Sequence, residues 1–469
     1  MELRAGEIAN LCGGRLRSGD PEHRFTVISF DSRRVTKGSL FAAIPGERVD
    51  GHDFVASALA AGASGALVMR PVALGGADPA AVVIEVADTT RALQDLASDW
   101  RKRLTARVIG VAGSNGKTST KDTLAAVLGE AGPTWATPGN ENSQIGAPLA
   151  VLGAPLDSEF VVLELGTSAP GELERLAKMA RPDHAVVTAA FAEHLEWLGS
   201  IAGVIEAETE ILDGLPAGGI ALIGSAEPGL VAAARRRSHV GVRALGLRGE
   251  DDWRLDDIRL GRGGTTFTLA RADAPTGTSE RRTWHTPLLG APAAWAGGFA
   301  AALATELGVD PETIQRGLDR VRPAAHRLVA REARGGALLI LDDCYNSNPA
   351  SCIAALDSAE ALAGNDERLV LVVGDMLELG EASEAAHREV GEAIAQRASR
   401  VDLLVAVGPE SRRIADAGVA AGIATRAVAG ADEALAAVEA ELADGRPTVL
   451  LAKASRGIGL DRLVAAIAD

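Results

Sequence analysis

The stretch RVIGVAGSNGKTSTKDTLAAVL, residues 107–128, constrains the fold more than any other part of the chain. Its continuous apolar run, 108–112, is typical of a buried parallel strand, and a helical pattern begins after Gly116. The glycine turn 113–116 joins the two. Such a connection directs backbone N–H groups and the positive end of the helix dipole at one point. The sequence therefore predicts a phosphate site inside an α/β domain.

The predicted phosphate loop is a variant of the P-loop, because Val111 stands where the full pattern has its outer glycine. Gly113 and Gly116 permit a tight, partly left-handed path that turns the amides inward. Lys117 offers a cation to β- and γ-phosphates, and Thr118 offers a hydroxyl to Mg²⁺. A turn with glycine and lysine by chance is the alternative. The predicted ATP-binding residues of the loop are Gly113, Ser114, Asn115, Gly116, Lys117, Thr118 and Ser119.

The order of apolar segments predicts an α/β fold with three domains. Residues 1–88 are typical of a small α/β substrate domain. Residues 89–322 predict a central parallel-sheet ATPase domain, which begins with a linker helix at 89–104 capped by Thr and includes an antiparallel excursion near Trp284. Residues 323–469 predict a Rossmann-like domain without a glycine fingerprint.

Composition excludes several classes of protein. With 63 acidic against 47 basic residues and a net charge of −16, the chain lacks the basic character of a non-specific nucleic-acid binder. No apolar run approaches ~18 residues, so no membrane span is predicted, and the amino terminus has no signal-peptide pattern. The three cysteines have no metal-ligand spacing and predict reduced thiols in a cytosolic protein.

The short G-x-x-G-K-T loop resembles that of the Mur ligases of peptidoglycan synthesis and their folylpolyglutamate synthetase relatives. Similar motifs run through nearly the whole chain. The stretches LDDCYNSNPAS (341–351) and VVGDMLELGEAS (372–383) most resemble the branch that adds D-Ala-D-Ala. The resemblance implies a cytoplasmic ligase that uses ATP and Mg²⁺ to join D-Ala-D-Ala to UDP-N-acetylmuramoyl-tripeptide through an acyl phosphate. We expect a monomer without a nucleic-acid partner.

The resemblance also assigns roles to individual residues. It implies catalytic roles for Lys117, Glu164, His194 and Glu208. The implied metal ligands are Thr118, Glu164, His194 and Glu208. Asp343 would meet the ribose and Asn346 the adenine side. The implied substrate-binding residues are Ser32 and Arg33 for the UDP-sugar, Asn142 and Ser143 near the acceptor peptide, Arg327, and Lys453, Ser455 and Arg456 at the amino-acid or phosphate end.

Two departures from the family pattern stand out. Most Mur ligases have a carbamoylated lysine fourteen residues after the metal-site histidine, and here Glu208 occupies that position. We hypothesise that its carboxylate replaces the carbamate; an acid on the helix surface is the alternative. In the stretch 290–300, Ala293 and Ala296 replace two asparagines that contact adenine in the family. Trp295 could stack on a base there, or the stretch is an apolar core helix.

Two rival functions remain open at this point. One is another ATP-dependent amino-acid ligase of the Mur or folylpolyglutamate type, which the stretches 341–351 and 372–383 argue against. The other is a non-catalytic paralogue that binds a nucleotide or UDP-sugar, which the missing lysine and asparagines leave open.

Overall fold

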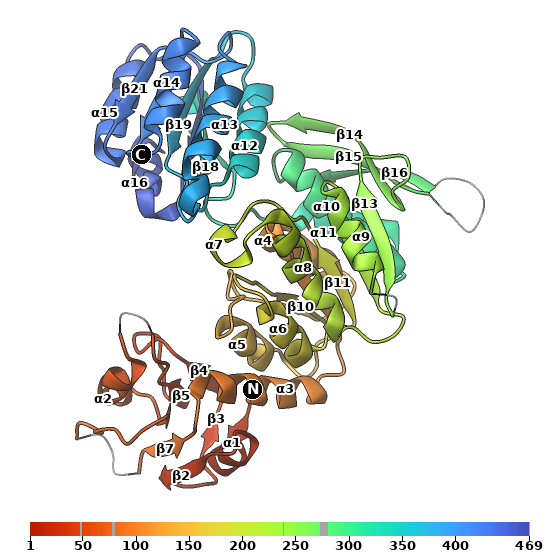
Figure 1. The fold of residues 1–469 in the computed structure, drawn as a ribbon, viewed down its shortest axis with the longest axis vertical. Helices are drawn as coiled ribbons and strands as arrows, with labels where there is room; N and C mark the ends of the chain where they lie inside the picture. The colour runs from red at the N-terminus through yellow and green to blue at the C-terminus, as the bar shows by residue number, and fades with distance from the viewer. Residues whose placement is uncertain (47–48, 77–79, 238, 273–279, 469) are drawn as a thin grey trace.

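The structure is a computed structural model that describes residues 1–46, 49–76, 80–237, 239–272 and 280–468. Three large sheets follow one another along the chain and along the long axis of the molecule, with the N-terminal sheet at one end and the C-terminal sheet at the other (Figure 1). This three-part α/β architecture confirms the predicted fold class. None of the described helices is long and apolar enough to cross a membrane.

The N-terminal sheet has the strand order β2-β7-β6-β5-β4. Strands β4 to β7 pair in parallel, and β2 joins β7 in the antiparallel sense. A separate antiparallel pair, β1 with β3, lies beside this sheet. The elements are β1 (Leu3–Arg4), α1 (Ala5–Leu11), β2 (Arg15–Ser18), β3 (Arg24–Phe25), β4 (Val27–Ser29), β5 (Ser39–Ala42), α2 (Val55–Ala60), β6 (Gly65–Val68) and β7 (Val82–Glu85).

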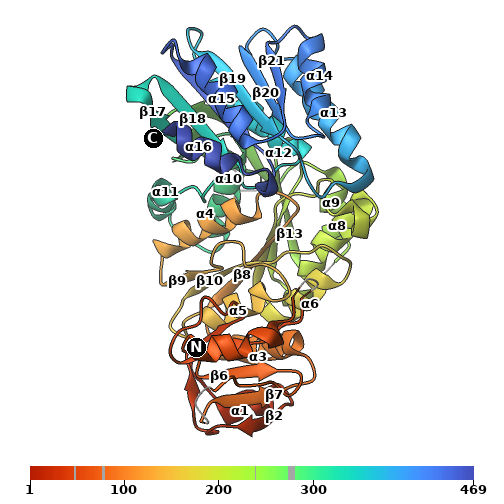
Figure 2. The ribbon, with the colours of Figure 1, turned by 90° about the vertical axis from the view of Figure 1, so that its left-hand side faces the viewer.

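Helix α3 (Thr89–Arg103) connects the N-terminal and central sheets and lies between them in both views (Figures 1 and 2). The predicted Thr cap is wrong. The Asp88 side chain caps the helix by accepting a hydrogen bond from the Arg91 N–H at 2.9 Å. Thr89 instead donates its hydroxyl to the carbonyl of Ala43 at 3.0 Å, which ties α3 to the N-terminal domain. Aspartate competes well for this position because its carboxylate accepts orphan N–H groups.

The central sheet has the order β16-β15-β14-β13-β12-β11-β8-β10-β9. Among its described strands, β14 pairs with β15 and β15 pairs with β16 in the antiparallel sense, and the other neighbours, including β13 and β14, pair in parallel. This confirms the predicted antiparallel excursion. Strand β8 is buried on both faces, with Val108 in one core and Ile109 in the other, which explains its continuous apolar run. The strands are β8 (Arg107–Ala112), β9 (Thr134–Ala136), β10 (Phe160–Glu164), β11 (His184–Val187), β12 (Ile220–Gly224), β13 (Gly241–Gly246), β14 (Trp253–Gly261), β15 (Gly264–Arg271) and β16 (Glu280–Thr286).

Strands β10 and β11 flank β8, and both pair with it in parallel. Residues that follow these three strands therefore meet at one edge of the sheet. Helix α10 is an apolar core helix in which Ala293 and Ala296 are both buried. The helices are α4 (Lys117–Gly129), α5 (Gly146–Gly153), α6 (Glu172–Ala180), α7 (Leu195–Leu198), α8 (Ile201–Thr209), α9 (Pro228–Arg235), α10 (Ala291–Glu306) and α11 (Pro311–Arg320).

The C-terminal sheet has the order β17-β18-β22-β19-β20-β21, with β17 antiparallel and the other strands parallel. Helices pack on both faces of this Rossmann-like sheet (Figure 2). The elements are β17 (Val329–Ala333), β18 (Leu338–Asp343), α12 (Pro349–Leu362), β19 (Arg368–Gly374), α13 (Ser383–Ala395), β20 (Leu403–Val407), α14 (Arg412–Ala420), β21 (Thr425–Val428), α15 (Ala431–Leu442), β22 (Thr448–Lys453) and α16 (Leu460–Ala468).

Candidate active site

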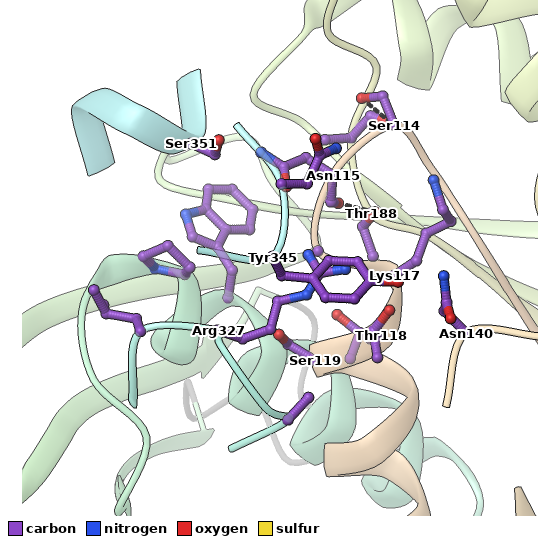
Figure 3. Close-up of a pocket in the computed structure, with 18 of the residues that line it drawn as sticks. Ser114, Asn115, Lys117, Thr118, Ser119, Asn140, Thr188, Arg327, Tyr345 and Ser351 are labelled. Atoms are coloured by element: carbon purple, nitrogen blue, oxygen red, sulfur yellow. Dashed lines mark hydrogen bonds between the residues drawn. The ribbon is translucent and has the colours of Figure 1, made fainter. Parts of the chain in front are cut away.

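A cavity of about 740 Å³ lies between the central and C-terminal domains. The central domain contributes the loop 114–119 and the segments that follow β10 and β11, and the C-terminal domain contributes residues after β18 and at the end of β22. Tyr345 and Arg327 lie beside Lys117 and Thr118, so side chains of the two domains meet in one place (Figure 3).

The phosphate loop is held in shape by the segment after β11. The Ser114 N–H donates to the Ala189 carbonyl at 2.9 Å, the Phe191 N–H donates to Ser114 Oγ at 2.6 Å, and Thr188 donates its hydroxyl to the carbonyl of Asn115. Gly113 has a φ of +124°, and a Cβ there would stand 2.2 Å from Thr188 Oγ1. Position 113 therefore requires glycine. Sequence reasoning missed Thr188, although its place at the carboxyl end of a neighbouring strand was a usable signal.

Lys117 is a cation among carboxylates. Its ammonium donates to the Gly113 carbonyl. Burial alone would lower the pKa of Lys117, but the charges of Glu193, Glu208 and Glu164 outweigh that effect and raise it. Lys117 therefore keeps its positive charge at neutral pH, as a phosphate-binding lysine needs. Sequence reasoning also missed Glu193, whose signal was its position directly before His194.

The carboxylate of Glu164 joins Thr118 of the phosphate loop to Asn142 in a compact polar group. Glu164 is 1 % exposed, and its Oε1 accepts hydrogen bonds from Asn142 Nδ2 at 2.7 Å and from Thr118 Oγ1 at 3.2 Å. Its Oε2 is buried and has no hydrogen-bond partner within the described chain. An unpaired buried carboxylate oxygen beside a hydroxyl is a donor set that suits a hard cation such as Mg²⁺.

Glu208 is buried rather than exposed, so the alternative of an acid on the helix surface is wrong. Its side chain leaves α8 toward the phosphate loop, where Oε2 accepts the Gly113 N–H at 2.7 Å. Glu208 is only 4 % exposed, and this burial raises its pKa to about 7, although the charge of Lys117 acts in the opposite direction. The carboxyl group of Glu208 is therefore buried against the backbone of the phosphate loop.

His194 lies at the start of α7 with a φ of +50° and lines the cavity. Its Nε2 is 3.1 Å from Glu193 Oε1, and this hydrogen bond raises the pKa of His194. Within the described chain, no three Asp, Glu, His or Cys side chains converge closely enough to hold a metal ion. The predicted metal residues are thus split: Thr118 lies with Glu164, while His194 and Glu208 have separate partners.

The C-terminal wall of the cavity carries a buried ion pair. Lys453 is 2 % exposed; its Nζ is 2.8 Å from Asp343 Oδ2 and donates to the carbonyl of Asn346 at 2.7 Å. The Arg327 guanidinium lies 4.2 Å from the centre of the Tyr345 ring. Tyr345 is the single tyrosine of the chain and was not singled out from the sequence, although it lies inside the stretch 341–351.

Four of the predicted substrate residues lie outside the cavity lining. Ser455 accepts the Leu377 N–H at 2.9 Å and so supports the stretch 372–383, and Arg456 starts a short 3₁₀ helix. Ser32 and Arg33 belong to the N-terminal domain, and Arg33 bonds to Asp31 there.

Asn142 and Ser143 both line the cavity. Ser143 also fixes the local turn, because its Oγ accepts the Gly146 N–H at 3.2 Å. Arg34 Nη1 lies 3.4 Å from Glu141 Oε1, which brings the N-terminal domain next to this turn.

Comparison with known proteins gives matches along nearly the whole chain. The model of the Mur ligase middle domain matches residues 111–304, that of the Mur ligase glutamate ligase domain matches 326–456, and that of the Mur ligase family catalytic domain matches 24–101. The UDP-N-acetylmuramoyl-tripeptide–D-alanyl-D-alanine ligase of Bacillus subtilis is 35 % identical over 97 % of this chain and 96 % of its own length. The ligase of the same name from Escherichia coli is 34 % identical over 100 % of this chain and 99 % of its own length.

Solved structures agree with these matches. The crystal structure of MurF from Acinetobacter baumannii is similar with a TM-score of 0.86 and 28 % identity over 100 % of this chain and 99 % of that one. MurF ligase from Thermotoga maritima, solved in complex with ADP, is similar with a TM-score of 0.78 and 27 % identity over 94 % of this chain and 96 % of that one. The sequence motifs, the three-domain fold and the phosphate loop are thus those of one group of proteins, and the chain belongs to the Mur ligase family.

Proposed function

We propose that this protein is an ATP-dependent ligase that joins D-Ala-D-Ala to UDP-N-acetylmuramoyl-tripeptide and so forms the UDP-linked pentapeptide. The observation that carries this proposal is the cavity between two domains, in which the phosphate loop faces Glu164 and Asn142. The full-length similarity to ligases of that name supports the choice of substrates.

The proposed reaction has two steps. The terminal carboxylate of the tripeptide attacks the γ-phosphorus of ATP, which forms an acyl phosphate and releases ADP. The amine of D-Ala-D-Ala then attacks the acyl carbon, and inorganic phosphate leaves from the tetrahedral intermediate. Lys117 and the loop amides offset the repulsion between the carboxylate and the phosphates. Enclosure between two domains keeps water from the acyl phosphate, which water would hydrolyse.

Thr118 and Glu164 are the residues that would hold Mg²⁺. Glu164 Oε2 supports this assignment, because it is buried without a partner in the described chain. A bound Mg²⁺ would supply charge neutralisation for the phosphate oxygens. Asn142 holds the other oxygen of Glu164 and so fixes the orientation of the carboxylate.

Glu208 takes over the role of the carbamoylated lysine in this proposal. Its carboxylate is already inside the site and points at the first glycine of the loop. A cation nearby favours the ionised form of such a buried acid. His194 acts together with Glu208 in this part of the site, and Glu193 orients the imidazole ring of His194.

The remaining assignments follow the order of the domains. Ser32 and Arg33 of the N-terminal domain bind the UDP-sugar, Asn142 and Ser143 lie near the peptide, and Asp343 and Asn346 meet the ribose and the adenine side of ATP. Arg327, Lys453, Ser455 and Arg456 act at the amino-acid or phosphate end. We also propose that the protein is monomeric and cytoplasmic, where ATP and nucleotide-linked substrates are available.

A coupled phosphate-release assay tests the proposed function. Purified protein receives ATP, Mg²⁺, UDP-N-acetylmuramoyl-tripeptide and D-Ala-D-Ala, and mass spectrometry identifies the product. We expect phosphate release that requires all four components and a product with the mass of the pentapeptide. Release with glutamate or another single amino acid, but not with the dipeptide, would favour a different amino-acid ligase. Absence of release at micromolar enzyme would favour the non-catalytic binder.

A further inference from the structure

Strand β14 reaches from the central domain to the C-terminal domain. Leu255, near the start of the strand, is buried in a core of the central domain together with Leu269 of β15. Leu260, near its end, packs against a core of the C-terminal domain to which α12 contributes. The end of β14 lies next to α12 in Figure 1, and the two elements are in contact. The hairpin formed by β14 and β15 therefore touches the interiors of both domains that enclose the cavity.

A β-bulge in β14, within residues 256–259, sets the direction of the Leu260 side chain. Leu255 and Leu260 are five residues apart, an odd separation that would place them on opposite faces of a regular strand. Their partners in β15, Leu269 and Thr265, are only four residues apart, because β14 has one extra residue at the bulge. The two leucines therefore lie on the same face of the sheet, and the bulge is what turns Leu260 toward α12.

The tip of this hairpin, residues 260–264, also carries an ion pair between the two domains. The Arg262 guanidinium donates to Oε1 of Glu367, which lies between α12 and β19. Oε2 of Glu367 accepts the Gly364 N–H at 2.8 Å, so the carboxylate is held in place on the C-terminal side. A partly exposed ion pair contributes little energy by itself, so this one fixes the orientation of the tip while Leu260 supplies the apolar contact.

The covalent connection between the two domains has only a short segment that can bend. The chain is bonded to the C-terminal domain from His326 onward. Its Nδ1 lies 2.9 Å from Asp342 Oδ2, and the Leu328 N–H donates to Asp343 Oδ1 at 3.1 Å. The segment 322–325 separates these contacts from the end of α11. One short segment permits rotation of one domain against the other, and the hairpin tip adds a second point of support.

We propose that docking of the hairpin tip on α12 holds the C-terminal wall of the cavity in place opposite the phosphate loop, and that Arg262 and Glu367 are a positioning pair for the ligase reaction. When the tip leaves α12, the C-terminal domain turns about the segment 322–325 and carries Tyr345 away from Lys117. The site then loses the contacts of that wall and its enclosure. The inference rests on the proposed nucleotide site, but the docking itself can be measured without a ligand.

Small-angle X-ray scattering of the ligand-free, full-length protein tests the docking. Leu260→Asp places a charge against an apolar core in the docked arrangement, whereas the same charge is in water once the tip has left α12. We expect a larger radius of gyration and a larger maximum dimension than in the wild type. Arg259→Asp is the matched control, because Arg259 is exposed and faces the opposite side of the same strand. A folded Leu260→Asp protein that scatters as the wild type does would overturn the docking role.

Charge reversal of the ion pair tests the positioning through calorimetric titration with ADP and Mg²⁺. Glu367→Arg sets two cations against each other and should weaken ADP binding about 5-fold, although residue 367 lies outside the cavity lining. Arg262→Glu should have a similar effect. The double variant Arg262→Glu/Glu367→Arg restores the pair with its charges exchanged, so we expect it to bind ADP within about 2-fold of the wild type.

The ligase assay adds a readout that a loss of stability would not give. In Glu367→Arg we expect the KM for ATP to rise about 5-fold and kcat to change by less than about 2-fold, because saturating ATP restores the docked arrangement. Absence of rescue in the double variant would show that Arg262 contacts the nucleotide directly and would overturn the positioning pair. If the wild type binds no ADP, the proposed nucleotide site is wrong, and the scattering of Leu260→Asp still decides the docking.

Discussion

The backbone N–H of Gly113 donates a hydrogen bond of 2.7 Å to Oε2 of Glu208. This contact joins the first glycine of the phosphate loop to helix α8, 95 residues later in the chain. Because Glu208 is buried, the contact both satisfies a loop amide and places an acid next to Lys117. The stability and the chemistry of the loop therefore depend on the same carboxyl group.

The first prediction concerns stability against pH in the absence of metal and nucleotide. Burial raises the pKa of Glu208 from 4.5 to about 7, so between these values the folded state binds more protons than the unfolded state. The contribution of this group is fully present below pH 4.5 and is lost as the pH rises through 7. Glu208→Gln cannot ionise, so its free energy of unfolding should rise relative to wild type by on the order of 3 kcal/mol across this range.

Urea unfolding in EDTA at pH 5, 6, 7 and 8 measures this difference. Glu206→Gln is the matched control on the same helix, because its side chain is 60 % exposed and pairs with Arg236 at the surface. A constant difference between Glu208→Gln and wild type at all four pH values would contradict the prediction.

The second prediction concerns carbon dioxide. If Glu208 replaces a carbamate, ligase activity of the wild type should not change when CO₂ is removed or when bicarbonate is added. Glu208→Lys should lose about 100-fold in kcat without bicarbonate and recover part of it in tens of millimolar bicarbonate, because a buried lysine with a lowered pKa can take up CO₂. Wild-type activity that rises with bicarbonate would argue against the replacement.

The third prediction concerns Glu164. Glu164→Gln removes the charge of a carboxylate that contacts Thr118 and Asn142, so we expect kcat to fall about 100-fold or more and the Mg²⁺ concentration for half-maximal activity to rise. Initial rates over a Mg²⁺ series measure both effects. Glu159→Gln, at the exposed position directly before the same strand, should behave as wild type. An unchanged Mg²⁺ dependence in Glu164→Gln would separate this residue from the metal.

The fourth prediction concerns the linker helix. Arg101 is 9 % exposed and holds α3 against the central domain through the Ala180 carbonyl at 2.8 Å and Asp183 at 3.1 Å. Arg101→Ala should lower the free energy of unfolding by about 3 kcal/mol, since it leaves buried acceptors without a partner. Arg91→Ala, on the exposed side of α3, should change it by less than about 0.5 kcal/mol. Equal thermal shifts for the two variants would refute this role.

Much of the architecture could be predicted from local patterns. The apolar runs at 108–112 and 338–341 read as buried strands because side chains on both faces of those strands enter a core. The alternation around Trp284 gave the antiparallel strands. The residue that caps α3 was harder to predict, because Asp88 and Thr89 are adjacent and both residue types can cap a helix. The domain boundaries after residues 88 and 322 remain predictions.

By itself, the sequence determined the fold class and the phosphate loop, since glycine spacing, Lys117 and the flanking apolar run act within a few residues of one another. It also pointed to Glu164 and Glu208 as acids of the site. Only the tertiary structure decided what each acid faces: parallel pairing of β8 with β10 sets Glu164 beside Thr118, and packing of α8 buries Glu208 against Gly113. Contacts between residues 46 or 95 positions apart depend on strand order and helix packing, which no local pattern encodes.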